Sequence, residues 1–185
     1  ETVFILDRDL LAAQSVAGRI GGVSLKCDVT RASSVERAFA HICRSSGGLD
    51  ILVSNAGAAW QGRIGEVDEK TLRDSFELNF WGHQRCAQAA VSIMKAQGTG
   101  GVLLFNTSKQ AINPGPSFGP YGLPKASTLF LSRQYALDHG ADGIRSNAVN
   151  ADRVRTGLLT EDMIKTRSEL RGISEQDYIA GNLLG

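Results

Sequence analysis

A tyrosine and a lysine four residues apart are the side chains of this sequence best placed to do chemistry together. Tyr121 and Lys125 stand in the stretch Tyr-Gly-Leu-Pro-Lys, and Ser108 precedes the tyrosine by 13 residues. Positions i and i+4 of a helix share a face, so the phenol and the ammonium group would point into the same space. A free phenol titrates at about 10 and a neighbouring positive charge lowers that value, so the pair is suited to proton transfer.

Further candidate residues, most of them polar or next to a polar residue, follow short apolar runs or lie within a long helical pattern. They are Asp7, the pair Asp28-Val29, the triplet Asn55-Ala56-Gly57, and Asn79. Asp7 ends the first apolar run, where an acid can hydrogen-bond the ribose hydroxyls of a dinucleotide's adenosine. Taken alone, Asp7 would be better explained as an acid that merely ends a strand.

Short apolar runs alternate with helical patterns along the first 149 residues. Strands are expected at Val3–Leu6, Val23–Leu25, Ile51–Val53, Val102–Phe105 and Ile144–Val149, and helices at Asp9–Arg19, Ser33–Arg44, Glu69–Ala96 and Tyr121–His139. The first, third and fourth runs are continuous, which is typical of strands covered on both faces. Ser33 and Glu36 have the spacing of a capping box. This repetition predicts βαβ units, a mostly parallel sheet and a single doubly wound α/β domain over residues 1–185.

Residues 151–185 depart from this alternation. They contain charges and one helical stretch, Thr160–Leu170, without a further strand. A segment that leaves the carboxyl end of the last strand is placed to cover a ligand crevice. We therefore expect residues 151–185, the lid segment, to cover a substrate. A surface helix of no functional role is the alternative.

The composition is that of an ordinary globular protein and argues against several classes of function. Of 185 residues, 42% are apolar and 21% charged, and the formal net charge is +1. This balance gives no reason to expect a nucleic acid or an anionic membrane as partner. The longest apolar run is too short for a membrane span. The scattered cysteines and histidines predict no metal site, and with no signal-peptide pattern a cytoplasmic protein is favoured.

The ordered set of polar residues, each at its expected strand or helix end, resembles the classical short-chain dehydrogenase/reductase family over residues 1–158. The resemblance implies a hydride-transfer enzyme in which a nicotinamide cofactor does the redox chemistry. It makes Tyr121 the general acid/base, with Lys125 lowering its pKa and holding the nicotinamide ribose. Ser108 would orient the substrate oxygen, and Asn79 would hold a helix kink and a proton-relay water.

The resemblance also implies contacts with the cofactor. Asp28 and Val29 match the pair that meets the adenine, and Asn55-Ala56-Gly57 the turn beside the adenosine ribose. Asp7 favours NAD over NADP because a carboxylate repels a 2′-phosphate, whereas the neighbouring Arg8 could accommodate one. The expected cofactor-binding residues are Asp7, Asp28, Val29, Asn55, Ala56, Gly57, Tyr121, Lys125, Val154 and Thr156.

Two features depart from the family pattern. Asn150-Ala151-Asp152 stands where most members read Asn-Pro-Gly. No Gly-rich phosphate loop opens a helix, because Gly18, Gly21 and Gly22 follow a helix instead. The family's first strand lies in mid-sheet, and unpaired main-chain groups there would cost about 1–3 kcal/mol each. We therefore expect a partial dinucleotide-binding domain, lacking the first and last strands, cut from a longer polypeptide.

The leading interpretation is an NAD-dependent oxidoreductase of a small alcohol or carbonyl compound. Ser108-Lys109 and the stretch Arg171–Leu184 resemble dehydrogenase domains fused behind a class II aldolase domain. That resemblance suggests a polyol, sugar or hydroxyaldehyde substrate. The alternatives are an NADPH-dependent ketone reductase and a non-catalytic dinucleotide-binding module. Family members commonly assemble through their two long helices, so we expect a homodimer or homotetramer, with Phe80 and Trp81 in its interface or in the core.

Overall fold

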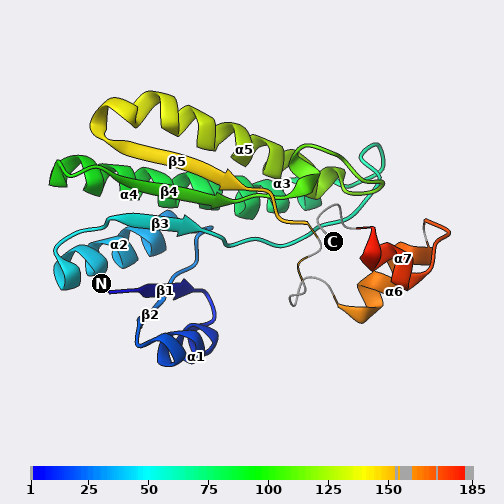
Figure 1. The fold of residues 1–185 in the computed structure, drawn as a ribbon, viewed down its shortest axis with the longest axis horizontal. Coiled ribbons are helices and arrows are strands. Elements are labelled where there is room, and N and C mark those ends of the chain that lie inside the picture. The colour runs from blue at the N-terminus through cyan, green and yellow to red at the C-terminus, as the bar shows by residue number, and fades with distance from the viewer. Residues whose placement is uncertain (1, 153, 155–159, 170, 182–185) are drawn as a thin grey trace.

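Five parallel strands in two sheets form the centre of the protein. The computed structural model describes residues 2–152, 154, 160–169 and 171–181. The strands are β1 (Phe4–Asp7), β2 (Val23–Lys26), β3 (Ile51–Ser54), β4 (Gly101–Asn106) and β5 (Ile144–Val149). β1 pairs with β2, and β3, β4 and β5 pair in that order (Figure 1). All five expected strands are confirmed, together with the mostly parallel α/β architecture.

No hydrogen-bonded strand pair joins the two sheets within the described residues. β1 and β3 each have a strand neighbour on one side only. Ile51 and Val53 of β3 are 60% and 59% exposed. The expectation of a strand covered on both faces is therefore wrong for β3. The first helix packs beside β1 and β2, whereas the helix of residues 82–97 packs on β3.

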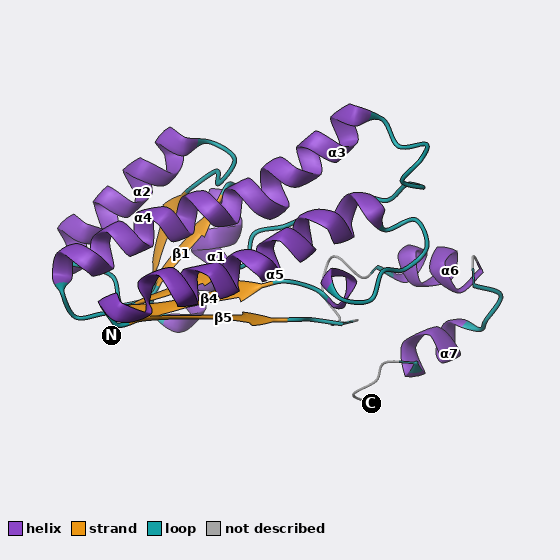
Figure 2. Ribbon diagram, turned by 90° about the horizontal axis from the view of Figure 1, so that it is seen from above, coloured by secondary structure: helices purple, strands orange, loops and turns teal. Residues whose placement is uncertain are grey.

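Helices connect the strands and cover the larger sheet. They are α1 (Leu10–Ile20), α2 (Ala32–Ser46), α3 (Glu69–Phe76), α4 (Gly82–Gln97), α5 (Gly119–His139), α6 (Glu161–Glu169) and α7 (Glu175–Ala180). α4 packs on β3 and β4, and α5 packs on β4 and β5. Figure 2 shows α2, α4 and α5 on the same side of the larger sheet. No described helix is long and apolar enough to cross a membrane.

The core lies between β4, β5 and the helices above them. Met94, Leu103, Phe105 and Ile144 are fully buried there. Burying each such side chain stabilises the fold by about 1.5–3 kcal/mol. A Cβ on Gly101 would lie 2.4 Å from the sulfur of Met94, so β4 begins at a residue without a side chain.

Three local features differ from the expectations. The helix expected over Glu69–Ala96 is interrupted by a π-helical turn, Glu77–Trp81. The capping box at Ser33 is wrong, because α2 begins without a side-chain cap and the Oγ of Ser34 accepts from the N–H of Asp28 instead. The short helix α7 was not expected, although Ser174 caps it by accepting from the N–H of Asp177.

The core makes a direct stability prediction. Phe105→Ala should lower the free energy of unfolding by about 3–5 kcal/mol, because it opens a cavity beside Tyr135 in a fully buried site. Urea unfolding measures this change. Leu11→Ala, at a side chain 77% exposed, is the control and should stay within about 0.5 kcal/mol of the parent. Equal losses in the two variants would contradict this account of the core.

Candidate active site

Tyr121 and Lys125 lie in the first two turns of α5, beside the carboxyl end of β4. A proline follows the first residue of the helix, where its missing N–H leaves no hydrogen bond unmade. The Nζ of Lys125 lies 5.8 Å from the centroid of the Tyr121 ring and donates to the main-chain oxygen of Asn106 at 2.9 Å. The lysine is only 3% exposed. The two side chains thus share one face of the helix, with the ammonium group buried.

Burial sets the acid–base character of this pair. It lowers the pKa of Lys125 from 10.5 to about 8. Burial also raises the pKa of Tyr121, and a hydrogen bond from Ser108 and the positive charge of Arg167 oppose that rise. The direction is opposite to the one expected from a neighbouring lysine. Desolvation of the phenol is the largest influence, and the charge that opposes it is that of Arg167, whereas the ammonium group of Lys125 donates to the carbonyl of Asn106.

Asn79 stands in the π-helical turn and binds the loop after β3. Its Nδ2 donates to the main-chain oxygen of Ala58 at 2.9 Å, and its Oδ1 accepts from the N–H of Ala58 at 3.2 Å. The main-chain oxygen of Asn79 accepts from the hydroxyl of Thr128 in α5, at 2.7 Å. A Cβ on Gly57 would lie 2.9 Å from Asn79 Oδ1 and 3.3 Å from Lys125 Nζ. Only a glycine lets this loop approach so closely.

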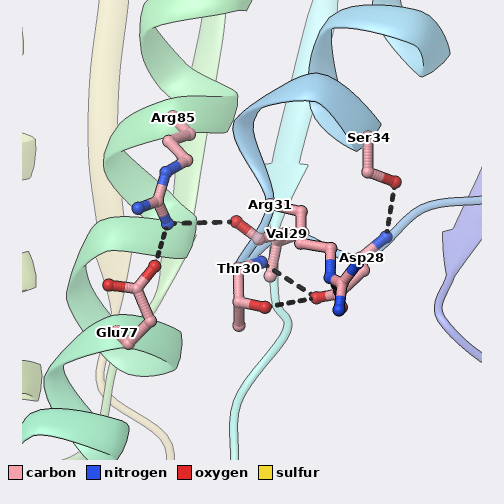
Figure 3. Close-up of polar contacts among 7 residues, drawn as sticks. All are labelled: Asp28, Val29, Thr30, Arg31, Ser34, Glu77 and Arg85. Atoms are coloured by element: carbon pink, nitrogen blue, oxygen red, sulfur yellow. Dashed lines mark hydrogen bonds and ion pairs between the residues drawn. The ribbon is translucent and has the colours of Figure 1, made fainter.

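The residues expected at the adenosine end lie at or just after the carboxyl ends of β1, β2 and β3. Asp7 Oδ1 accepts from the N–H of Asp9 at 2.9 Å. Asp28 Oδ1 accepts from the N–H and hydroxyl of Thr30, which lowers the pKa of Asp28 (Figure 3). Asn55 Oδ1 accepts from Asn106 Nδ2 at 2.6 Å. These contacts hold the three side chains in place without using all their acceptor capacity.

Val29 contacts α4 through both its carbonyl and its side chain. Its carbonyl accepts from Arg85, which also pairs with Glu77 at 2.6 Å (Figure 3). A Cβ on Gly82 would lie 2.8 Å from the Val29 side chain. Of the two expected contacts that follow β5, Val154 is exposed in a loop, and Thr156 lies outside the described residues.

The loop Asn150-Ala151-Asp152 is bound to the loop after β4. Lys109 Nζ pairs with Asp152 Oδ2 at 3.0 Å, and the N–H of Lys109 donates to the oxygen of Ala151. The hydroxyl of Thr107 donates to Asn150 Oδ1. Ala151 and Asp152, which replace Pro-Gly here, are therefore both bound to Lys109.

Helix α6 adds a residue that the sequence did not indicate. The guanidinium carbon of Arg167 lies 4.7 Å from the ring centroid of Phe118, and the Phe118 ring meets that of Tyr121 edge-on at 6.4 Å. Figure 1 shows α6 and α7 beyond the carboxyl ends of β4 and β5. Within the described residues, no group of three histidine, cysteine or carboxylate side chains gathers as a metal site would require.

The chain is similar to several known oxidoreductases. The family model described as enoyl-(acyl carrier protein) reductase matches residues 2–184. An uncharacterized oxidoreductase, YuxG, of Bacillus subtilis is 32% identical over 84% of this chain and 24% of its own length. The human dehydrogenase/reductase SDR family member 4 is 29% identical over 84% of this chain and 59% of its own length. The chain thus spans a quarter to about six tenths of these relatives.

Among solved structures, a 3-ketoacyl-(acyl-carrier-protein) reductase from Brucella melitensis, complexed with NADH, is also similar. The TM-score is 0.83 at 26% sequence identity, over 91% of this chain and 71% of that protein.

The buried lysine predicts a pH-dependent stability difference. Below pH 8 Lys125 is charged in both the folded and the unfolded state, so burying the charge lowers the free energy of unfolding by its full amount. Between pH 8 and 10.5 only the unfolded state keeps the proton, so this destabilisation decreases as the pH rises. Lys125→Met should therefore be more stable than the parent at pH 7 by about 1–3 kcal/mol, with a smaller difference at pH 10.

Urea unfolding of both proteins at the two pH values measures that difference. Lys165→Met, at an exposed lysine of α6, is the control and should show no such pH-dependent difference. A Lys125→Met difference that is zero at pH 7, or equal at both pH values, would contradict the assigned cost of burial.

Proposed function

Because the chain belongs to the short-chain dehydrogenase/reductase family of oxidoreductases, we propose that it transfers a hydride between NAD(H) and a small alcohol or carbonyl compound. The observation that carries this proposal is the convergence of Ser108, Tyr121 and Lys125 beside the carboxyl end of β4. Asn79 holds the neighbouring loop against them. Residues 1–185 would act as one partial dinucleotide-binding domain, with residues 151–185 as its substrate lid.

The residues present fit a nicotinamide dinucleotide. The loop after β3 lies against Lys125, since a Cβ on Gly57 would be 3.3 Å from Nζ, and Asp7, Asp28 and Asn55 keep acceptor capacity at the carboxyl ends of β1, β2 and β3. At the nicotinamide end, the ribose would be held by Lys125 and Tyr121, and the ring would lie near Val154 and Thr156. At the adenosine end, the ribose would be held by Asp7 and the Asn55-Ala56-Gly57 turn. The adenine would contact Asp28 and Val29. Bound there, the nicotinamide ring supplies or accepts the hydride.

The chain's own side chains handle the proton. Ser108 donates a hydrogen bond to the substrate oxygen and fixes its position next to the Tyr121 hydroxyl. In reduction, Tyr121 gives its proton to that oxygen; in oxidation, the phenolate takes it back. Lys125 stabilises the phenolate once it forms. Because the pKa of Lys125 is about 8, the lysine loses its charge as the pH rises through that value. Asn79 fixes the loop after β3 through its two hydrogen bonds to the main chain of Ala58.

The proposed substrate is a polyol, sugar or hydroxyaldehyde, on the resemblance carried by Ser108-Lys109 and the stretch 171–184. An NADPH-dependent ketone reductase is the second candidate, because Arg8 follows Asp7 directly. We also propose a homodimer or homotetramer built on α4 and α5. Trp81 and Phe130 support it, since they are 47% and 65% exposed. The free state of all three cysteines supports a cytoplasmic location.

Tyr121→Phe tests the catalytic assignment. The variant keeps the ring packing and loses the hydroxyl, so turnover should fall at least about 100-fold while NADH binding is retained. Steady-state kinetics and NADH fluorescence titration give the two quantities. Tyr135→Phe is the matched control. The hydroxyl of Tyr135 donates to Gln84, not to a residue of the site, so this variant should keep its turnover. Unchanged turnover in Tyr121→Phe would contradict the assignment of Tyr121 as the general acid/base.

Asp7→Ser tests the cofactor assignment. Removing the carboxylate that repels a 2′-phosphate should raise the ratio of NADP to NAD use by about 10-fold or more, because the neighbouring Arg8 could then bind that phosphate. The kcat/KM values for both cofactors give that ratio. Asp9→Ser, two residues on, should leave the ratio unchanged. A parent enzyme that already prefers NADPH would instead support the ketone reductase.

A further inference from the structure

Arg167 places a positive charge one aromatic ring away from the proposed catalytic phenol. Its guanidinium carbon stacks 4.7 Å from the centroid of Phe118, and that ring meets Tyr121 edge-on. The charge reaches the phenol, because it is one of the influences that oppose the burial-driven rise in the pKa of Tyr121. Arg167 therefore borders the space in which a substrate would meet Tyr121.

The hydrogen-bonding capacity of Arg167 is mostly unused. Among the described residues, its Nη1 makes one long hydrogen bond, 3.5 Å, to the hydroxyl of Tyr178, and its Nε is buried without a partner. No carboxylate in the described part of the chain forms an ion pair with it. A guanidinium carries five donors and stays charged, so a half-buried one without an anion is unfavourable. Buried donors in native structures normally have partners.

Other cations near the site have partners within the chain. Lys109 pairs with Asp152 at 3.0 Å, and Lys125 donates to the main-chain oxygen of Asn106. Arg85 pairs with Glu77. Arg167 differs from all three, and it is also the one that faces Phe118 and Tyr121. The charge that would complete its environment is therefore an anion from outside the described residues.

We propose that Arg167 binds an anionic oxygen group, a carboxylate or a phosphate, on the substrate whose hydroxyl or carbonyl carbon reacts at Tyr121. The planar fork of N–H donors in a guanidinium matches both groups, which can accept two parallel hydrogen bonds. This inference rests on the proposed dehydrogenase function and narrows its substrate to sugar acids, hydroxy acids or phosphorylated sugars. A neutral polyol could accept a hydrogen bond from Arg167 but would leave its positive charge without a counter-ion.

Anion binding is measured first, because it needs no turnover. Inorganic phosphate and acetate are titrated separately by calorimetry into the protein saturated with NADH, so that anions do not occupy the cofactor's own phosphate site. The parent should bind at least one of the two saturably. Arg167→Gln should weaken that binding at least tenfold. Lys165→Gln, which removes an exposed charge from the same helix, should bind as the parent does.

Paired substrates then identify the source of the anion. NADH-dependent reduction of acetoacetate is compared with that of its methyl ester, and reduction of glyceraldehyde 3-phosphate with that of glyceraldehyde. In the preferred pair, the parent should favour the anionic member at least tenfold in kcat/KM. Arg167→Gln should reduce that preference mainly through KM. Preference for the acetoacetate pair indicates a carboxylate, and preference for the glyceraldehyde pair indicates a phosphate.

The outcomes separate this inference from the proposed function. Absence of saturable anion binding in the parent, or equal binding in Arg167→Gln, overturns the anion site even if neutral carbonyls are reduced. Anion binding that depends on Arg167, without reduction of any carbonyl, supports the site and counts against the dehydrogenase. If Arg167→Gln does not fold, Arg167→Lys decides: it keeps a charge over Phe118 but loses the fork, so anion binding should weaken severalfold. Unchanged binding in that variant also overturns the proposal.

Discussion

The close approach of the loop after β3 to the π-helical turn is the constraint on which the rest of the site depends. Asn79 uses both ends of its amide on Ala58, and this is possible only because Gly57 has no side chain to meet Asn79 and Lys125. The π turn gives Asn79 the position from which it reaches the loop. Thr128 then ties the same turn to α5. One pair of hydrogen bonds thus sets the spacing of three elements.

Buried charge is the second determinant, and it acts on the chemistry. Lys125 is almost wholly removed from solvent and is compensated by a single main-chain carbonyl. Its pKa falls toward neutrality while that of Tyr121 rises, so both move in the directions that burial dictates. The half-buried guanidinium of Arg167 adds positive charge on the other side of Phe118. The described site is therefore electrostatically suited to a negatively charged ligand.

Local patterns predicted the elements well where short-range physics decides them. The apolar runs at β4 and β5 are confirmed as strands, and their buried side chains pack against α4 and α5. The capping role given to Ser33 was wrong, because Ser34 had a better partner in the N–H of Asp28, outside the helix. The resemblance placed a helix kink at Asn79, but the periodic pattern of Glu69–Ala96 gave no sign of the π turn found there, because a contact 21 residues away in the chain stabilises it.

The sequence by itself determined the order of the elements and the helical register of Tyr121 and Lys125, because apolar periodicity and i, i+4 spacing are properties of consecutive residues. Only the tertiary structure decided how far each side chain is buried, which carbonyl meets the lysine, and that Arg167 of α6 lies over Phe118. Those outcomes depend on segments dozens of residues apart packing together. Desolvation and charge are set by that packing, so the pKa directions and the unpaired guanidinium could not be predicted from the chain alone.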